Sequence, residues 1–314
     1  MSLDEIRAAN ARIASIVLHT PLLNSEALSN SLGGDLYLKL ENLQVTGSFK
    51  IRGAANKLSQ ITKDSSIVTA SAGNHGQAVA LCAQTFRLKA KIIVPETTPK
   101  VKINKIKQYN QELILHGSVY DEAEDYAKEL AVKENMSYAS PYNDLQVIEG
   151  QGTIALEILS QLNDVDVIIV PVGGGGLISG IGLAAKNLKS EIEIIGVQAE
   201  ASPTMYESFL AGRQVDTKVD DTIADGLSGN LEDGSITFGF ARKCVDEMII
   251  VREESIMKAI RLLWEKEGQI VEGSGAVPVA AILENKIHRP KKKVVAVISG
   301  SNIDTEKFKT IVEV

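Results

Sequence analysis

Short, strongly apolar runs rich in Val and Ile alternate along this chain with longer amphipathic stretches. Runs this apolar are typical of strands buried on both faces, as in a parallel sheet. The expected strands are Ile67–Thr69, Lys91–Val94, Glu112–Leu115, Val167–Val170, Ile192–Val197, Met248–Val251 and Val294–Ile298. The expected helices are Asn74–Gln84, Asp121–Glu134, Gly150–Gln161, Leu177–Asn187 and Glu254–Glu267. Strand and helix therefore alternate, which predicts an α/β fold with mostly parallel, doubly wound sheets.

Length and composition limit the class of protein. A chain of 314 residues favours two domains or one large doubly wound unit. We expect a cytoplasmic protein without membrane contact, because the sequence shows no basic, apolar leader and no long apolar run. The net charge of −7 argues against a nucleic-acid partner. Cys82 and Cys244 lack the paired spacing of a metal or redox site, so we expect no metal.

Three expected strands are followed directly by turns of small or polar residues. These turns are Ser71-Ala-Gly-Asn-His-Gly, Val172-Gly-Gly-Gly-Gly-Leu and Ser299-Gly-Ser-Asn. In open α/β sheets, ligands bind in the crevice beyond the carboxyl ends of the strands. We therefore expect the three turns to share one site.

Four consecutive glycines, Gly173 to Gly176, follow one of these strands and precede a helix. Without side chains, successive backbone N–H groups can converge on an anion at the helix N-terminus, so the predicted ligand is a phosphate. The spacing matches neither G-x-G-x-x-G nor a Walker loop, which disfavours a nucleoside triphosphate. A dinucleotide site and a tightly packed turn without ligand remain as alternatives.

Lys50 follows the short segment Thr46-Gly-Ser-Phe, which consists mostly of small residues, and begins an expected helical stretch that runs to Leu58. Most lysines near a helix start are solvated. A lysine that attacks an aldehyde must be neutral, and burial near other cations lowers its pKa toward that state.

Asn74 and His75 offer hydrogen-bond donors at the start of another expected helix, where an amino-acid carboxylate would be favoured. A helix cap with a surface histidine is the alternative.

Seven motifs in order resemble those of the threonine/serine dehydratases and serine racemases, fold type II pyridoxal-phosphate enzymes. The motifs, which span nearly the whole chain, are Lys39-Leu-Glu-Asn-Leu-Gln-Val-Thr-Gly-Ser-Phe-Lys-Ile-Arg-Gly, Ser71-Ala-Gly-Asn-His-Gly-Gln-Ala, Gly150-Gln-Gly-Thr, Gly173–Leu177, Thr222-Ile-Ala-Asp-Gly, Glu272-Gly-Ser-Gly-Ala and Ser299-Gly-Ser-Asn-Ile-Asp. The resemblance implies a fold like that of the tryptophan synthase β-subunit, with pyridoxal 5'-phosphate as cofactor. In length the chain is most similar to the short threonine dehydratases.

The resemblance also implies roles for single residues. Lys50 would carry the cofactor as a Schiff base, Phe49 would lie against its ring and Asn74 would bind the ring hydroxyl. The other implied contacts are the Gly173, Gly174, Gly175, Gly176 and Leu177 amides with the phosphate, Gly226 with the ring, Ser299 with the pyridine nitrogen, and Ser71, Asn74 and His75 with the substrate carboxylate. A neutral hydroxyl at Ser299 does not enforce a protonated pyridine, so prompt loss of a β-hydroxyl is favoured over a long-lived carbanion.

The expected reaction is β-elimination of a small hydroxy amino acid. Lys50 would remove the α-proton, and the β-hydroxyl would leave as water with a proton supplied by the cofactor phosphate. Hydrolysis of the product would give ammonia and 2-oxobutanoate from threonine, or pyruvate from serine. Serine racemases carry a serine where this chain has Ala72, which cannot transfer a proton, so a racemase is the second hypothesis. A dehydratase of another substrate such as 3-hydroxyaspartate, and a noncatalytic phosphate or nucleotide binder, remain as further alternatives.

Family resemblance implies two domains with the cofactor between them. The predicted small domain is 65–142, inserted into a large, discontinuous domain of 1–64 and 143–314. A homodimer or homotetramer is expected on the same grounds. The acidic cation site of the racemases is in doubt, because Glu200 has no aspartate after it before Gly212.

Overall fold

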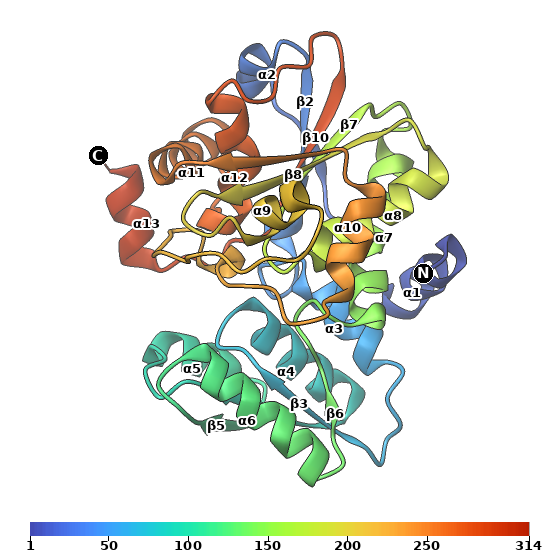
Figure 1. Cartoon of the computed structure of the whole chain (residues 1–314), viewed down its shortest axis with the longest axis vertical. Helices are drawn as coiled ribbons and strands as arrows, with labels where there is room; N and C mark the ends of the chain where they lie inside the picture. The colour runs from blue at the N-terminus through green and yellow to red at the C-terminus, as the bar shows by residue number, and fades with distance from the viewer. Residues whose placement is uncertain (314) are drawn as a thin grey trace.

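The computed structural model describes residues 1–313 and contains two sheets, each with its own helices (Figure 1). The larger sheet has the strand order β1-β2-β10-β7-β8-β9, and only β1 runs antiparallel to its neighbour. Its strands are β1 (Leu22–Asn24), β2 (Asp35–Leu40), β10 (Lys293–Ile298), β7 (Val167–Pro171), β8 (Glu193–Ala199) and β9 (Glu247–Val251). The smaller sheet is parallel and consists of β5 (Glu112–Leu115), β4 (Lys89–Val94), β3 (Ser66–Ala70) and β6 (Ser137–Tyr138).

Both faces of the larger sheet are buried, and alternate residues of a strand belong to different cores. In β7, Val167 and Ile169 pack into one cluster, whereas Ile168 and Val170 pack into the other. The first core includes α2 (Glu26–Leu32), α11 (Glu253–Glu267), α12 (Gly273–Leu283) and α13 (Thr305–Val312). The second includes α1 (Leu3–Ile13), α7 (Leu145–Gln161), α8 (Gly176–Leu188), α9 (Thr204–Ala211) and α10 (Ile236–Cys244). Burial on both faces explains why these strands read as nearly unbroken apolar runs.

The smaller sheet is covered by α4 (Asn74–Phe86), α5 (Lys100–Lys107) and α6 (Tyr120–Lys133). The helix α3 (Lys50–Leu58) joins this core, because Ile51 packs in the same cluster as Ile67 of β3. On another side α3 approaches α7 so closely that a Cβ at Gly53 would lie 2.5 Å from Nε2 of Gln151. Lys50 therefore begins a helix wedged between the two sheets. The smaller sheet falls within 65–142, but the domain boundaries themselves stay predictions.

All seven expected strands and five expected helices are confirmed, with ends shifted by a few residues. The largest shift is at α7, which begins at Leu145 because the Asp144 side chain accepts the N–H groups of Gln146 and Val147. The prediction did not assign β1, β2, β6, several helices, or the 3₁₀ turns η1 (Glu41–Leu43) and η2 (Asp225–Leu227). None of the helices within residues 1–313 combines the length and apolar character that crossing a bilayer requires.

Candidate active site

The three small-residue turns follow β3, β7 and β10, so they lie at the carboxyl ends of strands from both sheets. Two of these turns touch directly, because Nδ2 of Asn302 donates to Oδ1 of Asn74 at 2.7 Å. Asn74 begins α4 of the smaller sheet, and Asn302 follows β10 of the larger one. The candidate site is therefore built between the sheets.

Lys50 lies at the start of α3, and its amine is held by a backbone carbonyl. The Nζ atom donates to the oxygen of Pro141 at 2.8 Å and lies 5.2 Å from the ring centroid of Phe49. Burial lowers the pKa of this amine to about 8, while the negative charge of Glu272 opposes that effect. A substantial share of Lys50 is therefore neutral near physiological pH, as nucleophilic attack requires.

The glycine turn after β7 leaves no room for side chains. A Cβ at Gly174 would overlap the ring of Tyr142, which follows the carbonyl that holds Lys50. Gly175 caps α8 with φ of 83°, in the left-handed region that favours glycine. Close approach and backbone conformation thus both select glycine, and they place the turn next to the Lys50 segment.

The same turn has unpaired donors. Within residues 1–313, no protein acceptor receives the amide N–H groups of 173–177. Two carbonyl oxygens of the turn are bonded: that of Gly174 accepts Oγ1 of Thr237 at 2.7 Å, and that of Gly175 accepts the N–H of Ser179 at 3.0 Å. Buried atoms nearby also lack partners in the described chain: Oγ of Ser48, Oγ of Ser274 and Nδ1 of His75. Buried polar atoms are rarely left unpaired without a ligand or water. These unpaired donors and acceptors fit a group with an anionic tail and a polar ring, and pyridoxal phosphate is such a group.

The turn after β3 places its predicted substrate residues at the start of α4. Oγ of Ser71 accepts the N–H of Gly73 at 3.2 Å. Nε2 of His75 lies 3.0 Å from the oxygen of Ala139, and burial with the nearby Lys50 charge lowers the imidazole pKa to about 3. The ring is therefore neutral, with its proton on Nε2 toward the carbonyl. His75 can contribute to carboxylate binding through its main-chain N–H, whereas Nδ1 is left as an acceptor.

The remaining predicted residues surround the same space. Ser299 is buried, and its carbonyl accepts the N–H of Phe49 at 3.1 Å. A Cβ at Gly226 would lie 2.8 Å from Oγ of Ser274, and one at Gly173 would lie 3.4 Å from the Gly226 oxygen. Leu177 is buried at the start of α8. The segments of Phe49, Gly173, Gly226 and Ser299 are thus linked by close contacts, whereas their roles toward a cofactor stay predictions.

Sequence reasoning missed three residues of the site: Pro141, Tyr142 and Glu272. Pro141 acts through its carbonyl, which no side-chain pattern reveals. Glu272 is buried, and burial together with the charge of Asp225 raises its pKa to about 7. A usable signal was present, because Glu272 precedes Gly-Ser-Gly at the start of a segment too apolar for a solvated acid.

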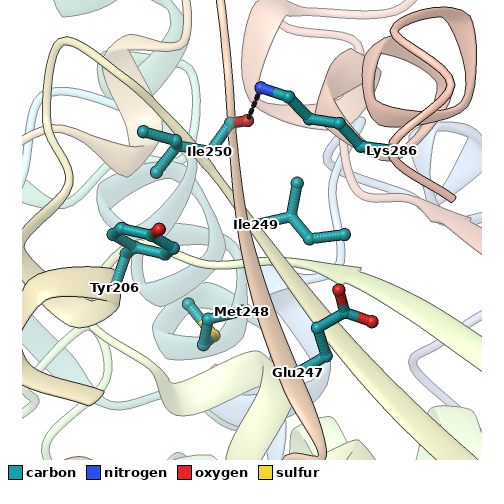
Figure 2. Close-up of a pocket in the computed structure, with 6 residues that line it drawn as sticks. All are labelled: Tyr206, Glu247, Met248, Ile249, Ile250 and Lys286. Carbon is teal, nitrogen blue, oxygen red and sulfur yellow. Dashed lines mark hydrogen bonds between the residues drawn. The ribbon is translucent and has the colours of Figure 1, made fainter. Parts of the chain in front are cut away.

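A pocket elsewhere contains none of the predicted site residues (Figure 2). It lies along the edge strand β9 and is lined by Tyr206, Glu247, Met248, Ile249, Ile250 and Lys286. Nζ of Lys286 donates to the Ile250 oxygen at 2.8 Å, so a charged side chain covers an otherwise free carbonyl of the edge. Within residues 1–313, Glu200 included, no three His, Cys, Asp or Glu side chains are grouped as metal ligands.

Comparison with known proteins gives consistent matches over nearly the full length. Residues 13–300 match the model of a family described as pyridoxal-phosphate dependent enzyme. An L-threonine ammonia-lyase of Thermotoga maritima is 45% identical over 315 residues, which cover 99% of this chain and 78% of the relative. These matches confirm the predicted resemblance.

Solved structures confirm the predicted fold class. A maize serine racemase superposes with a TM-score of 0.93 at 35% identity, covering 98% of this chain and 96% of that one. The processed form of threonine deaminase isoform 2 from Solanum lycopersicum gives 0.90 at 37% identity, covering 99% and 93%. Both proteins share the two-sheet α/β architecture with this chain.

Proposed function

Because the chain belongs to the family of pyridoxal-phosphate-dependent enzymes, we propose that it is an ammonia-lyase that converts L-threonine to 2-oxobutanoate and ammonia, and L-serine, as a related substrate, to pyruvate and ammonia. One observation carries the proposal: the partly neutral Lys50 amine is held by Pro141, and the glycine turn with its unpaired amides packs against the next residue, Tyr142. The similarity to an L-threonine ammonia-lyase supports the substrate class.

The residues that would hold the cofactor are Lys50, Phe49, Asn74, Gly226, Ser299 and the amides of 173–177. When bound, pyridoxal phosphate supplies an electron sink for the bond broken at the α-carbon of the substrate. Lys50 is the base in this proposal, since burial brings the pKa of its amine to about 8, close to neutral pH. The Pro141 carbonyl orients that amine.

Substrate binding falls to the start of α4. Within residues 1–313, the N–H groups of Asn74, His75 and Gly76 meet no protein acceptor, and the helix dipole adds to their attraction for a carboxylate. The neutral His75 imidazole adds no charge of its own. Loss of the α-proton and the β-hydroxyl, followed by hydrolysis, gives 2-oxobutanoate and ammonia from threonine.

Racemisation is the second candidate function, favoured by the likeness to a maize serine racemase. A racemase needs an acid or base on each face of the α-carbon. Ala72, which precedes the Gly73 turn, packs against an apolar cluster and carries no transferable proton. Elimination is therefore the better-supported reaction.

The test is to incubate the cofactor-loaded chain with threonine, serine and 3-hydroxyaspartate while measuring ammonia and 2-oxo acid together. We expect equimolar ammonia and 2-oxobutanoate from threonine, and loss of both in Lys50→Ala. Chiral analysis of residual serine checks for racemisation. D-serine without pyruvate would replace this proposal by the racemase, and nucleotide binding by a chain that ignores pyridoxal phosphate would replace it by a noncatalytic binder.

A homodimer or homotetramer is part of the proposal. Leu18, Leu43 and Val45 are about half exposed, and Gln44 joins their segments by hydrogen bonds to both backbone groups of Leu18. Exposed apolar side chains gathered in this way are typical of an interface with another chain. Light scattering of the purified protein measures the mass directly. The cytoplasmic location and the lack of nucleic-acid partners stay predictions.

A further inference from the structure

Glu272 is a buried carboxylate in the site with no ion-pair partner in the described chain. It precedes α12 and is 6% exposed, and its N–H donates to the Gly300 oxygen. Oε1 accepts Nδ2 of Asn74 at 2.8 Å, and Oε2 accepts the N–H of Asn302 at 2.9 Å. Within residues 1–313, no Lys, Arg or His lies close enough to pair with it. A buried charge held only by neutral donors is costly, which calls for a functional reason.

The carboxylate determines which way the Asn74 amide points. Above its pKa of about 7, Glu272 is a carboxylate that only accepts hydrogen bonds, so the NH₂ group of Asn74 must face it. Asn302 fixes the other end, because its Nδ2 donates both to the Thr46 oxygen at 2.8 Å and to Oδ1 of Asn74 at 2.7 Å. Oδ1 of Asn302 in turn accepts Nζ of Lys105 from α5 at 3.1 Å. Asn74 is thus held in one orientation, with a second N–H free for a ligand.

The charged groups around Glu272 come from several elements. Lys50 begins α3, Asp225 lies on η2 and Lys102 lies on α5. Asp225 opposes ionisation of Glu272, and Lys102 favours it. The charge of Glu272 favours the protonated form of Lys50, which opposes the effect of burial on that amine. His75, the other titratable group near Lys50, is neutral.

We propose that Glu272 is a positioning residue, which turns the Asn74 amide toward the cofactor ring and holds a negative charge beside the Lys50 amine. The inference rests on the proposed function, because both targets belong to the proposed cofactor site. It assigns a role to a residue that has no direct contact with the substrate in that proposal. Its two effects, one of geometry and one of charge, can be separated by substitution.

The experiment uses the full-length chain freed of cofactor and measures its capture of pyridoxal phosphate by absorbance. Glu272→Gln removes the charge. Its side-chain NH₂ group then faces either Nδ2 of Asn74 or the N–H of Asn302, so one of the two hydrogen bonds is lost. We expect the pH midpoint of the capture rate to fall below the wild-type value near 8, and the cofactor affinity to weaken about tenfold, the loss of one buried hydrogen bond. Asn302→Ala removes a partner of Asn74 without changing charge, so affinity should weaken while the midpoint stays in place.

Glu253→Gln is the matched control, because Glu253 also accepts two hydrogen bonds, from Thr222 and Ile223, but unlike Glu272 it does not shift the Lys50 pKa. Its midpoint and affinity should equal those of the wild type. An unshifted midpoint with unchanged affinity in Glu272→Gln would overturn the inference while leaving the proposed function intact. Should that variant not fold, unchanged affinity in Asn302→Ala overturns the orienting role. A wild-type chain that fails to capture pyridoxal phosphate overturns the proposed function as well.

Discussion

At the scale of single residues, the protonation of Lys50 controls how fast the chain captures its cofactor. Only the neutral amine attacks an aldehyde, and burial brings the Lys50 pKa to about 8. The rate of pyridoxal phosphate capture by the cofactor-free chain should therefore rise about tenfold for each pH unit below that midpoint and level off above it. Stopped-flow absorbance measures this rate. A flat profile across the midpoint would exclude Lys50 as the titrating group.

His75 gives a second pH-dependent prediction. Its folded pKa of about 3 lies below the ordinary value of 6.5, so the neutral ring stabilises the fold above pH 6.5. That contribution is lost as the pH falls from 6.5 toward 3, because the unfolded chain takes up the proton first. Between pH 6.5 and 3, the unfolding free energy of His75→Gln should fall less steeply with decreasing pH than that of the wild type, by up to about 1.4 kcal/mol per pH unit. Urea unfolding over a pH series checks this; equal slopes in both proteins would contradict it.

The site residues divide into those that the sequence predicts and those that need the fold. Lys50 and Gly173 to Gly176 are recognisable because their neighbours in the chain define their surroundings. The sequence marks Glu272 as an unusual acid but does not reveal its partner, since Asn74 is far away in sequence and approaches Glu272 only in the folded chain. The orientation of the His75 imidazole also needs the fold: the ring is buried rather than on the surface, and its Nε2 faces the Ala139 oxygen.

At the scale of elements, the glycine turn depends on the Tyr142 ring that fills the space of the missing side chain. Gly174→Ala should lower the unfolding free energy by about 1–3 kcal/mol through overpacking and weaken cofactor binding. Gly239→Ala in α10 is the control, because a Cβ there has no neighbour within 4 Å. Thermal unfolding and cofactor titration measure both effects. If Tyr142→Ala fails to relieve the Gly174→Ala defect, the ring is not its cause.

Elements were predictable where periodicity was strong. The strands of both sheets read as apolar runs, and helices such as α11 show an amphipathic pattern. In contrast, α12 is buried almost throughout, begins with Gly-Ser-Gly and contains Pro278, so it has no polar face to mark it as a helix. The strand β6 has only two residues, too few for any alternation to show. The helix α12 and the strand β6 can therefore be assigned only from their neighbours in the folded structure.

At the scale of the whole molecule, a buried charge network fixes α3 between the sheets. Arg52, fully buried, donates to Glu41 at 2.7 and 2.8 Å and to Glu157 at 2.7 and 3.0 Å. Lys39 of β2 donates to the same Glu157 at 2.6 Å, so two cations balance two carboxylates. The network links β2, η1, α3 and α7, and it anchors the helix that begins with Lys50.

Removing Arg52 leaves a surplus of buried negative charge. Arg52→Leu should lower the unfolding free energy by about 3–5 kcal/mol, because removing the cation leaves the carboxylates of Glu41 and Glu157 buried without enough positive charge to offset their desolvation. Arg7→Leu, which removes an exposed pair with Asp4, should change it by less than about 1 kcal/mol. Urea unfolding of the two variants gives the comparison. Equal stability of both would show that the network does not hold α3 in place.

The central claim is that Lys50 forms the covalent bond to the cofactor. Borohydride reduction of the loaded protein, followed by proteolysis and mass spectrometry, locates the pyridoxyl group. The account predicts a single modified peptide with the added mass on Lys50. A pyridoxyl group on another lysine, or on none, would contradict it.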